Sequence, residues 1–141
     1  MDKIIYRYGN ALDIDQVIEL YCASTLGERR PVDNQVTMGR MIEHANLVVT
    51  AWDGEQLVGI ARTLTDFDYV GYLADLAVRA SHQRRGIGIE LIRQTRARMG
   101  TSSMLVLLAA PRAVGYYPKI GFSRHGSAWT LHASDALADS T

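Results

Sequence analysis

The chain has little of what a disulfide-stapled, secreted or nucleic-acid-binding protein would show. Cys22 is its only cysteine, so no intramolecular disulfide can form, and we expect a reducing, cytoplasmic environment. Fifteen Lys and Arg residues balance fifteen Asp and Glu residues, so the protein carries no overall field that would attract nucleic acid or an anionic membrane. Any site for an anion must therefore be local.

Long apolar runs and metal-ligand clusters are missing as well. The longest apolar run, residues 104–110, is much shorter than the ~20 residues of a membrane-spanning helix, so we expect a buried central strand there and no membrane partner. The four histidines are scattered without the spacing of metal ligands, so we expect no metal site.

The composition is that of one ordinary globular domain. The 141 residues are 48% hydrophobic and 21% charged, which suits a single core. We therefore predict one domain over residues 1–133, followed by a small, polar tail over residues 134–141.

Hydrophobic periodicity predicts a protein of both helices and strands, of the α/β (α+β) class. Asp53-Gly54 between two β-rich runs predicts a hairpin, and Asp13 followed by Gln16 predicts a capping box that opens a helix. Asp33 is expected to cap a second helix and Gly100 to end a third. The predicted strands span residues 4–8, 47–52, 56–64, 69–78, 104–110 and 127–132, and the predicted helices begin near residues 14, 34, 87 and 112.

A glycine-containing turn lies between the predicted strand 69–78 and the helix that follows it. In Gln83-Arg84-Arg85-Gly86-Ile87-Gly88, the glycines let a ligand approach the backbone, and the free N–H groups at the helix start favour an anion such as phosphate. Leu91 stands where a dinucleotide-binding fingerprint needs its third glycine or alanine, and the Gly-Lys-Ser/Thr of a P-loop is absent. A plain tight turn is the alternative interpretation.

Two motifs together resemble the GNAT superfamily of N-acetyltransferases. The order strand, Q/R-x-x-G-x-G/A, helix resembles its acetyl-CoA-binding motif, and residues 113–122 resemble its carboxyl-terminal motif A-x-x-x-Y-x-x-x-G-F. The resemblance implies the GNAT fold, a mixed, mostly antiparallel sheet with a splayed central strand pair and flanking helices. It also implies acetyl-CoA as the co-substrate.

The resemblance assigns the residues that would hold acetyl-CoA. They are Leu76, Ala77 and Val78 along the pantetheine arm, Gln83, Arg84, Arg85, Gly86, Ile87, Gly88 and Ile89 around the pyrophosphate, and Tyr117 at the thiol.

Tyr117 is also the general acid that the resemblance implies. A phenol with a reference pKa of about 10 is protonated at neutral pH and can donate its proton to the departing thiolate. The alternative is an aromatic side chain packed beside Phe122, a role that Tyr116 could fill instead.

Acidic residues are the candidates for binding or deprotonating the acceptor. Asp75 stands in an otherwise apolar run, so we predict that it faces the cleft and acts on the acceptor amine. Regular alternation would place Leu73 and Ala77 on the same face as Asp75. Asp66 matches a second acidic position in a group of small GNAT proteins and is a further substrate-binding candidate, with turn formation as the alternative. Tyr21 is expected to help enclose the acceptor.

The sequence therefore predicts N-acetylation of a primary amine of a small molecule by direct attack on acetyl-CoA. Two alternatives stay open, acetylation of a protein N-terminus or lysine, and a non-catalytic acyl-CoA-binding regulatory module. The sequence is also compatible with a homodimer.

Overall fold

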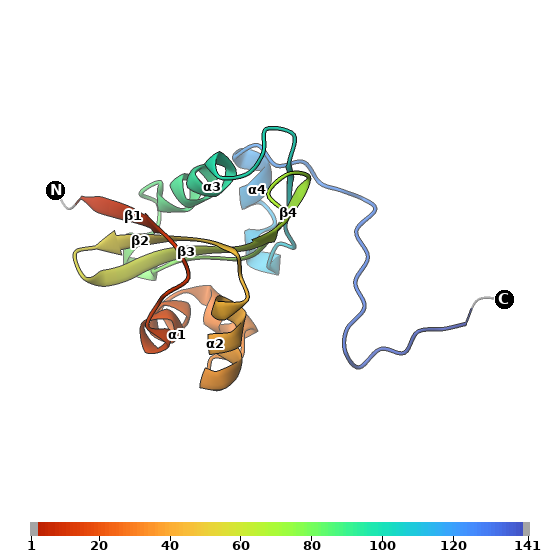
Figure 1. Cartoon of the computed structure of the whole chain (residues 1–141), viewed down its shortest axis with the longest axis horizontal. Helices are drawn as coiled ribbons and strands as arrows, with labels where there is room; N and C mark the ends of the chain where they lie inside the picture. The colour runs from red at the N-terminus through yellow and green to blue at the C-terminus, as the bar shows by residue number, and fades with distance from the viewer. Residues whose placement is uncertain (1–2, 140–141) are drawn as a thin grey trace. The chain divides into compact units, whose positions relative to one another are not determined.

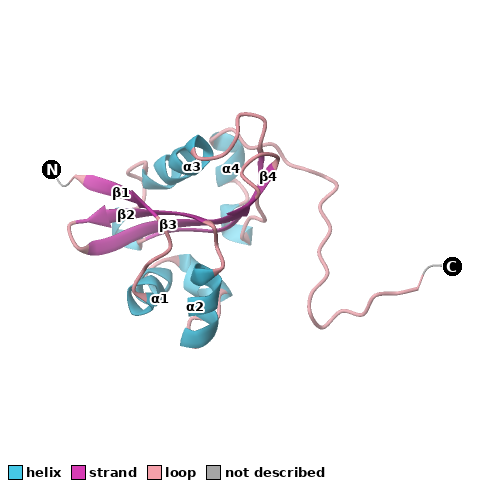
Figure 2. Ribbon diagram, viewed as in Figure 1, coloured by secondary structure: helices cyan, strands magenta, loops and turns pink. Residues whose placement is uncertain are grey.

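The computed structural model describes residues 3–139, which fall into two compact units. Residues 3–108 form the N-unit and residues 109–139 the C-unit. The predicted tail, residues 134–141, belongs to the C-unit, and its residues 140 and 141 lie outside the described range. The sheet and the longer helices belong to the N-unit, whereas the C-unit holds short helical turns and coil (Figure 2). Within residues 3–139, no helix is both long and apolar enough to cross a membrane.

The N-unit is built on a five-stranded mixed sheet in the order β1-β2-β3-β4-β5. The strands are β1 (Ile4–Tyr8), β2 (Leu47–Asp53), β3 (Gln56–Thr65), β4 (Val70–Val78) and β5 (Met104–Val106). Neighbours among the first four are antiparallel, and β5 runs parallel to β4. The predicted Asp53-Gly54 hairpin is confirmed, with Gly54 in the left-handed region at φ +60° between β2 and β3.

Helices cover both faces of this sheet (Figure 1). α1 (Ile14–Cys22) and α2 (Gln35–Glu43) lie on one face, and α3 (Ile87–Ala97) lies on the other. The 3₁₀ turn η1 (Thr25–Arg29) joins α1 to α2. Asp13 caps α1 as predicted, but its carboxylate accepts a hydrogen bond from the Asp15 N–H, and Gln16 donates to the Glu55 carbonyl. The cap is therefore confirmed without the predicted capping box.

The other two predicted caps are wrong by one or two residues. Asn34, rather than Asp33, accepts the Thr37 N–H at the start of α2. The C-cap of α3 is Arg98, and Gly100 serves another purpose, because its N–H donates to the Phe67 carbonyl at 2.6 Å. A Cβ at Gly100 would meet that carbonyl oxygen at 3.0 Å, so glycine permits this close approach of two backbones.

The core lies between the sheet and the two helices α1 and α2. Val17, Leu20 and Tyr21 are fully buried, and their i, i+3, i+4 spacing places them on one side of α1. They pack with Met38 and Ile42 of α2 against β3 and β4. This layer fixes α1 across the middle of the sheet.

β4 contains a bulge that decides which of its side chains share a face. Arg62 of β3 pairs with Asp75, but the next residue, Thr63, pairs with Leu73, so Ala74 is an extra residue in β4. Directly paired residues project from the same face of a sheet. Leu73 therefore faces α3, whereas Asp75 faces α1 and α2, and the predicted common face of these two residues is wrong.

The predicted strand 104–110 is much shorter in the structure. β5 ends at Val106 and pairs with β4 only from Val70 to Tyr72, and Met104 is 52% exposed. It is an edge strand of the described sheet rather than the predicted central one, because it stands last in the strand order next to β4. β4 and β5 separate after these three pairs. This separation is the splayed strand pair that the resemblance implies.

The predicted strand 127–132 is wrong, since this segment has no regular secondary structure. An alternating apolar pattern favours a strand only where a neighbouring strand satisfies its backbone groups. No strand within residues 3–139 pairs with this segment.

The C-unit contains η3 (Pro111–Ala113) and the four-residue helix α4 (Tyr116–Lys119). The helix predicted to begin near residue 112 is thus found as two short elements, the second of which contains a proline, Pro118. Pro118 lies in the first turn, where a backbone N–H has no intrahelical acceptor and its loss costs little.

Candidate active site

The turn between β4 and α3 has the geometry of an anion site. Gly86 is the N-cap of α3 with φ +78°, a left-handed conformation that glycine adopts without strain. No side chain within residues 3–139 caps the helix there, and a Cβ on Gly86 would meet no described atom within 4 Å. The N–H groups at the start of this eleven-residue helix therefore face open space.

Positive charge and strain lie in the same turn. Arg84 and Arg85 are exposed, and Arg84 has φ +64°, which is uncommon for a residue with a side chain. Ile87 is 2% exposed and anchors the helix start against the α3 side of the sheet, whereas Gly88 and Ile89 are half-buried. Most of the residues predicted around the pyrophosphate thus surround one solvent-facing turn.

A buried histidine braces this turn from behind. His82 Nε2 lies 2.8 Å from Asp53 Oδ2, and His82 Nδ1 lies 2.8 Å from Ser81 Oγ. Asp53 belongs to β2, so this contact ties the beginning of the turn to the β2–β3 hairpin. In the sequence, His82 is one of four scattered histidines, and nothing in their spacing indicates this contact.

The edge of β4 offers free backbone groups next to the turn. The Arg79 N–H donates to Val58 of β3, and in an antiparallel strand the N–H and C=O groups of successive residues point to alternate sides. Ala77 therefore faces β3, while Leu76 and Val78 face the opposite edge. No described strand pairs with that edge beyond Tyr72.

The three predicted pantetheine contacts are therefore not equivalent. Leu76 and Val78 present backbone groups along the free edge, although the Val78 carbonyl already accepts a hydrogen bond from Gln83 Nε2 at 3.0 Å. Ala77 has its side chain in the core at 2% exposure and its backbone directed at β3.

Asp75 lies in a buried cluster of charged and polar groups on the α1 side of the sheet. Its Oδ1 accepts a hydrogen bond from Arg30 Nε at 2.6 Å. Its Oδ2 accepts from Tyr21 Oη at 2.6 Å and from Arg62 Nε at 2.5 Å. The Asp75 side chain is 0% exposed, and Arg30 also donates to the Ala74 carbonyl at 2.9 Å. Of the predicted substrate residues, Tyr21 and Asp75 are thus brought together.

These contacts set the ionisation of both partners. Burial would raise the pKa of Asp75, but the hydrogen bond and charge of Arg62, with Tyr21 and Arg30, outweigh burial and hold that pKa below its ordinary value. Burial, and then the charge of Asp75, raise the pKa of Tyr21 well above 10. With both oxygens paired and a lowered pKa, the Asp75 carboxylate is suited to anchoring the cationic groups around it rather than to acting as a general base.

Arg30 and Arg62 are the members of this cluster that were not among the predicted site residues. For Arg62 a signal was present, since it is the only charged residue of β3, just as Asp75 is the only charged residue of β4. Two opposite charges in adjacent antiparallel strands predict an ion pair when the register brings them together.

Asp66 lies elsewhere and has a structural role in the β3–β4 turn. Its Oδ1 accepts the N–H groups of Asp68, Tyr69 and Val70 at 2.8–3.1 Å. Hydrogen bonds from the Tyr69 and Val70 backbone hold the pKa of Asp66 below its ordinary value. Val70 is five residues from Asp75 along β4, or about 16 Å at 3.3 Å per residue, so Asp66 and Asp75 do not share one site.

Tyr117 is packed among aromatic rings within the C-unit. Its ring makes edge-to-face contacts with Tyr116 at 5.3 Å and with Phe122 at 5.4 Å between centroids. Burial, and secondarily Tyr116, raise the pKa of Tyr117, so its hydroxyl keeps its proton at neutral pH. Tyr117 therefore packs beside Phe122, as the alternative interpretation expected, and also keeps a protonated hydroxyl that can act as a proton donor.

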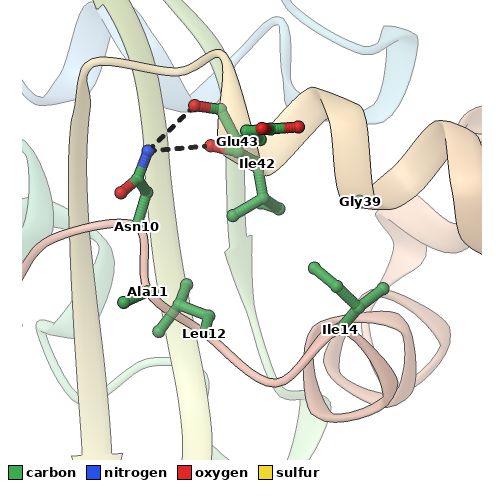
Figure 3. A pocket seen from close by; sticks show the side chains of 7 residues that line it. All are labelled: Asn10, Ala11, Leu12, Ile14, Gly39, Ile42 and Glu43. Atoms are coloured by element: carbon green, nitrogen blue, oxygen red, sulfur yellow. Dashed lines mark hydrogen bonds between the residues drawn. The ribbon is translucent and has the colours of Figure 1, made fainter.

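A separate hollow of about 450 Å³ lies between α2 and the segment before α1 (Figure 3). Ile14 and Ile42 point into it, and Asn10 at its edge donates hydrogen bonds to the Ile42 and Glu43 carbonyls at the end of α2. None of the predicted site residues lines this hollow. Among the described residues, no group of three or more His, Cys, Asp or Glu side chains could hold a metal ion.

Comparison with known proteins decides the family. A model of the acetyltransferase (GNAT) domain matches residues 24–131, which is most of the chain. The chain belongs to the GNAT acetyltransferase family.

Solved structures share the GNAT fold over nearly the whole chain. A putative GNAT-family acetyltransferase from Xanthomonas campestris is 23% identical with a TM-score of 0.74, and 94% of each chain is covered. A GNAT-family protein from Streptococcus pneumoniae is 23% identical with a TM-score of 0.70, covering 92% of this chain and 98% of the other. An aminoglycoside N-acetyltransferase in complex with CoA is 16% identical with a TM-score of 0.72, covering 95% of this chain and 97% of the other. No curated protein matches the sequence.

Proposed function

We propose that this GNAT protein transfers the acetyl group of acetyl-CoA to a primary amine of a small molecule. The observation that carries the proposal is the free edge of β4 that leads directly into the uncapped start of α3 at Gly86. Amide groups of a pantetheine arm can pair with Leu76 and Val78 as an added strand would. The pyrophosphate then meets the N–H groups at the helix start, where the helix dipole favours negative charge.

The transfer needs one bond made, one bond broken and two protons accounted for. The neutral amine nitrogen forms a bond to the thioester carbonyl carbon, and the carbon–sulfur bond breaks to release a thiolate. Tyr117 donates its phenolic proton to that thiolate, a role that its raised pKa supports by keeping the phenol protonated. The proton lost by the amine passes to water and restores Tyr117 through solvent.

The proton on the acceptor sets the pH dependence. An alkyl amine with a pKa near 10.4 costs about 4–5 kcal/mol to deprotonate at pH 7. Asp75 has no unpaired oxygen to take this proton, so we assign deprotonation to water. The rate constant for acetylation should therefore rise as the pH is raised toward the pKa of the acceptor amine, because the fraction of neutral amine increases.

A small acceptor is favoured over a protein segment by the anchoring of η1. Arg30, next to η1, bonds both the Asp75 carboxylate and the Ala74 carbonyl of β4. These two contacts hold the segment after η1 against β4, so they narrow the space through which an acceptor can reach the site from the α1 side. A peptide acceptor would need an open groove there.

The test is thiol release from acetyl-CoA in the presence of a panel of small amines, with calorimetry of CoA binding on the same protein. Binding of CoA together with amine-dependent thiol release supports the proposal. A protein that binds no CoA, or one that acetylates only protein N-termini or lysines, contradicts it.

A further inference from the structure

The sheet carries an exposed apolar surface where β4 and β5 begin to part. Leu64, Tyr72 and Val106 pair in a row across β3, β4 and β5, so their side chains share one face. Val70 and Met104 are the adjoining pair on that face. Leu64, Tyr72 and Met104 are 41%, 40% and 52% exposed. We name these five residues the Tyr72 face.

The Tyr72 face borders the place where the thioester must lie. A pantetheine arm on the free edge of β4 has its pyrophosphate end beyond Val78, so its thioester end points back toward Tyr72. Tyr72 and Val106 are the last pair before the two strands separate. The thioester end of the arm therefore approaches this face.

Only one side of the sheet is open at this point. On the α3 side Leu73 is 3% exposed, and a Cβ on Gly71 would meet Met99 Cε at 2.6 Å. That side of β4 is filled by its own packing, so an acceptor has to come from the side of the Tyr72 face.

The two carboxylates that the sequence predicted to bind the acceptor, those of Asp75 and Asp66, are engaged in contacts of their own. Both oxygens of Asp75 are paired with Arg30, Arg62 and Tyr21. Oδ1 of Asp66 is occupied by three backbone N–H groups, and Asp66 and Asp68 both lie in the turn before Val70, at the far end of the face. Arg30 and Arg62 carry two positive charges against the single negative charge of Asp75, so this cluster has no net negative charge to attract a polycation.

We infer that the acceptor is a primary amine on an uncharged aliphatic or aromatic body, which lies on the Tyr72 face while its amino group reaches the thioester. Polycationic amines such as aminosugars and polyamines are poor acceptors, although two structural neighbours are aminoglycoside acetyltransferases. The inference rests on the proposed function and adds the class of amine to it.

The test measures kcat/KM for straight-chain amines from propylamine to hexylamine, for 2-phenylethylamine, and for spermidine and an aminoglycoside. The alkyl amines have closely similar ammonium pKa values, so reactivity is constant and only the apolar body changes. Each methylene placed on an apolar surface should raise kcat/KM, by about fourfold at full burial. Spermidine and the aminoglycoside should fall at least about tenfold below hexylamine.

A matched pair of variants locates the effect. Leu64→Ser and Ile5→Ser each remove an apolar side chain of nearly equal exposure, 41% and 42%, from a strand of the same sheet. Ile5 lies on β1, at the opposite edge from β5. Leu64→Ser should flatten the dependence of kcat/KM on chain length, whereas Ile5→Ser should leave its slope unchanged.

The outcomes separate this inference from the proposed function. The inference is supported if kcat/KM increases with the chain length of the amine in the wild type and in Ile5→Ser but not in Leu64→Ser. Acetylation that is independent of chain length, or fastest with the polycations, overturns the inference and leaves the proposed function intact. Acetyl-CoA binding without transfer to any amine overturns both. The wild-type chain-length series remains decisive even if a serine variant does not fold.

Discussion

Replacing Asp75 with Asn should destabilise the protein strongly. The substitution keeps the shape of the side chain but removes the charge that compensates Arg30 and Arg62, whose side chains are 24% and 11% exposed. It also turns an amide N–H toward guanidinium donors. Removing one partner of a buried ion pair costs about 3–5 kcal/mol, which is a large share of the ~5–15 kcal/mol that stabilises a typical domain.

The measurement is urea unfolding followed by circular dichroism. With a slope of about 1–3 kcal/mol per molar urea, a loss of 3–5 kcal/mol lowers the midpoint by ~1 M or more. Asp66→Asn is the matched control, because Asp66 is exposed and an Asn in its place keeps the Oδ1 that accepts the turn N–H groups. It should change the free energy of unfolding little.

The pH dependence adds an independent check with a definite sign. The native pKa of Asp75 lies below its unfolded value of about 3.9, so the charged carboxylate contributes stability above that pH and loses it as the pH falls through the native pKa. The difference in unfolding free energy between wild type and Asp75→Asn should therefore shrink below about pH 4. A difference under ~1 kcal/mol at pH 7 would refute the anchoring role.

The same variant distinguishes anchoring from proton transfer. If Asp75 were the general base, Asp75→Asn would slow acetylation at neutral pH and recover at high pH, with the melting temperature nearly unchanged. If Asp75 anchors the cluster, the melting temperature falls and the folded variant keeps the wild-type shape of its pH–rate profile. We expect the second result.

Three further substitutions test other parts of the molecule. Gly86→Ala should weaken acetyl-CoA binding at least about tenfold in calorimetry, because the left-handed φ strains an alanine and the new Cβ fills open space that the pyrophosphate would approach, while the backbone strain costs only ~1–2 kcal/mol of stability; unchanged affinity would remove the turn from the site. Tyr117→Phe should lower turnover by roughly 10²-fold with CoA affinity preserved, and equal turnover in a step limited by chemistry would leave Tyr117 as a packing residue. Gly39→Ala should raise the free energy of unfolding by about 0.5–1 kcal/mol, because Gly39 lies within α2 and an added Cβ would meet only Ile14 Cγ1 at 3.8 Å; a lower melting temperature would contradict this.

Local patterns predicted the parts of the fold that depend on neighbours in sequence. The Asp53-Gly54 hairpin, the Asp13 cap and the turn from β4 into α3 follow from residue types at short spacing, and the structure contains each of them. Residues 104–110 and 127–132 were less predictable, because a strand also requires a partner from elsewhere in the chain. The apolar run continues past Val106 while its neighbour β4 diverges from it.

The chemistry of Asp75 shows the same limit at the level of one residue. Its sequence context indicated correctly that a charge in an apolar strand needs a purpose. Its partners come from α1, the segment after η1 and β3, and the bulge at Ala74 turns Asp75 toward them. None of these contacts is visible in the spacing of the β4 sequence alone, so proton transfer and anchoring could not be distinguished there.

α1 supports both parts of the candidate acetyl-CoA site, the free edge of β4 and the turn before α3, through residues that lie next to each part. Glu19 of α1 makes a bidentate pair with Arg79 at 2.6 and 2.5 Å, just before the turn. The Ala80 N–H donates to the Ala23 carbonyl at the end of α1, and Tyr21 bonds Asp75 beside Leu76. The same helix thus braces both the strand edge and the start of the turn. Because binding at a preorganised site avoids the cost of ordering it, weakening α1 should reduce affinity for acetyl-CoA through the geometry of β4 and the turn rather than through lost contacts.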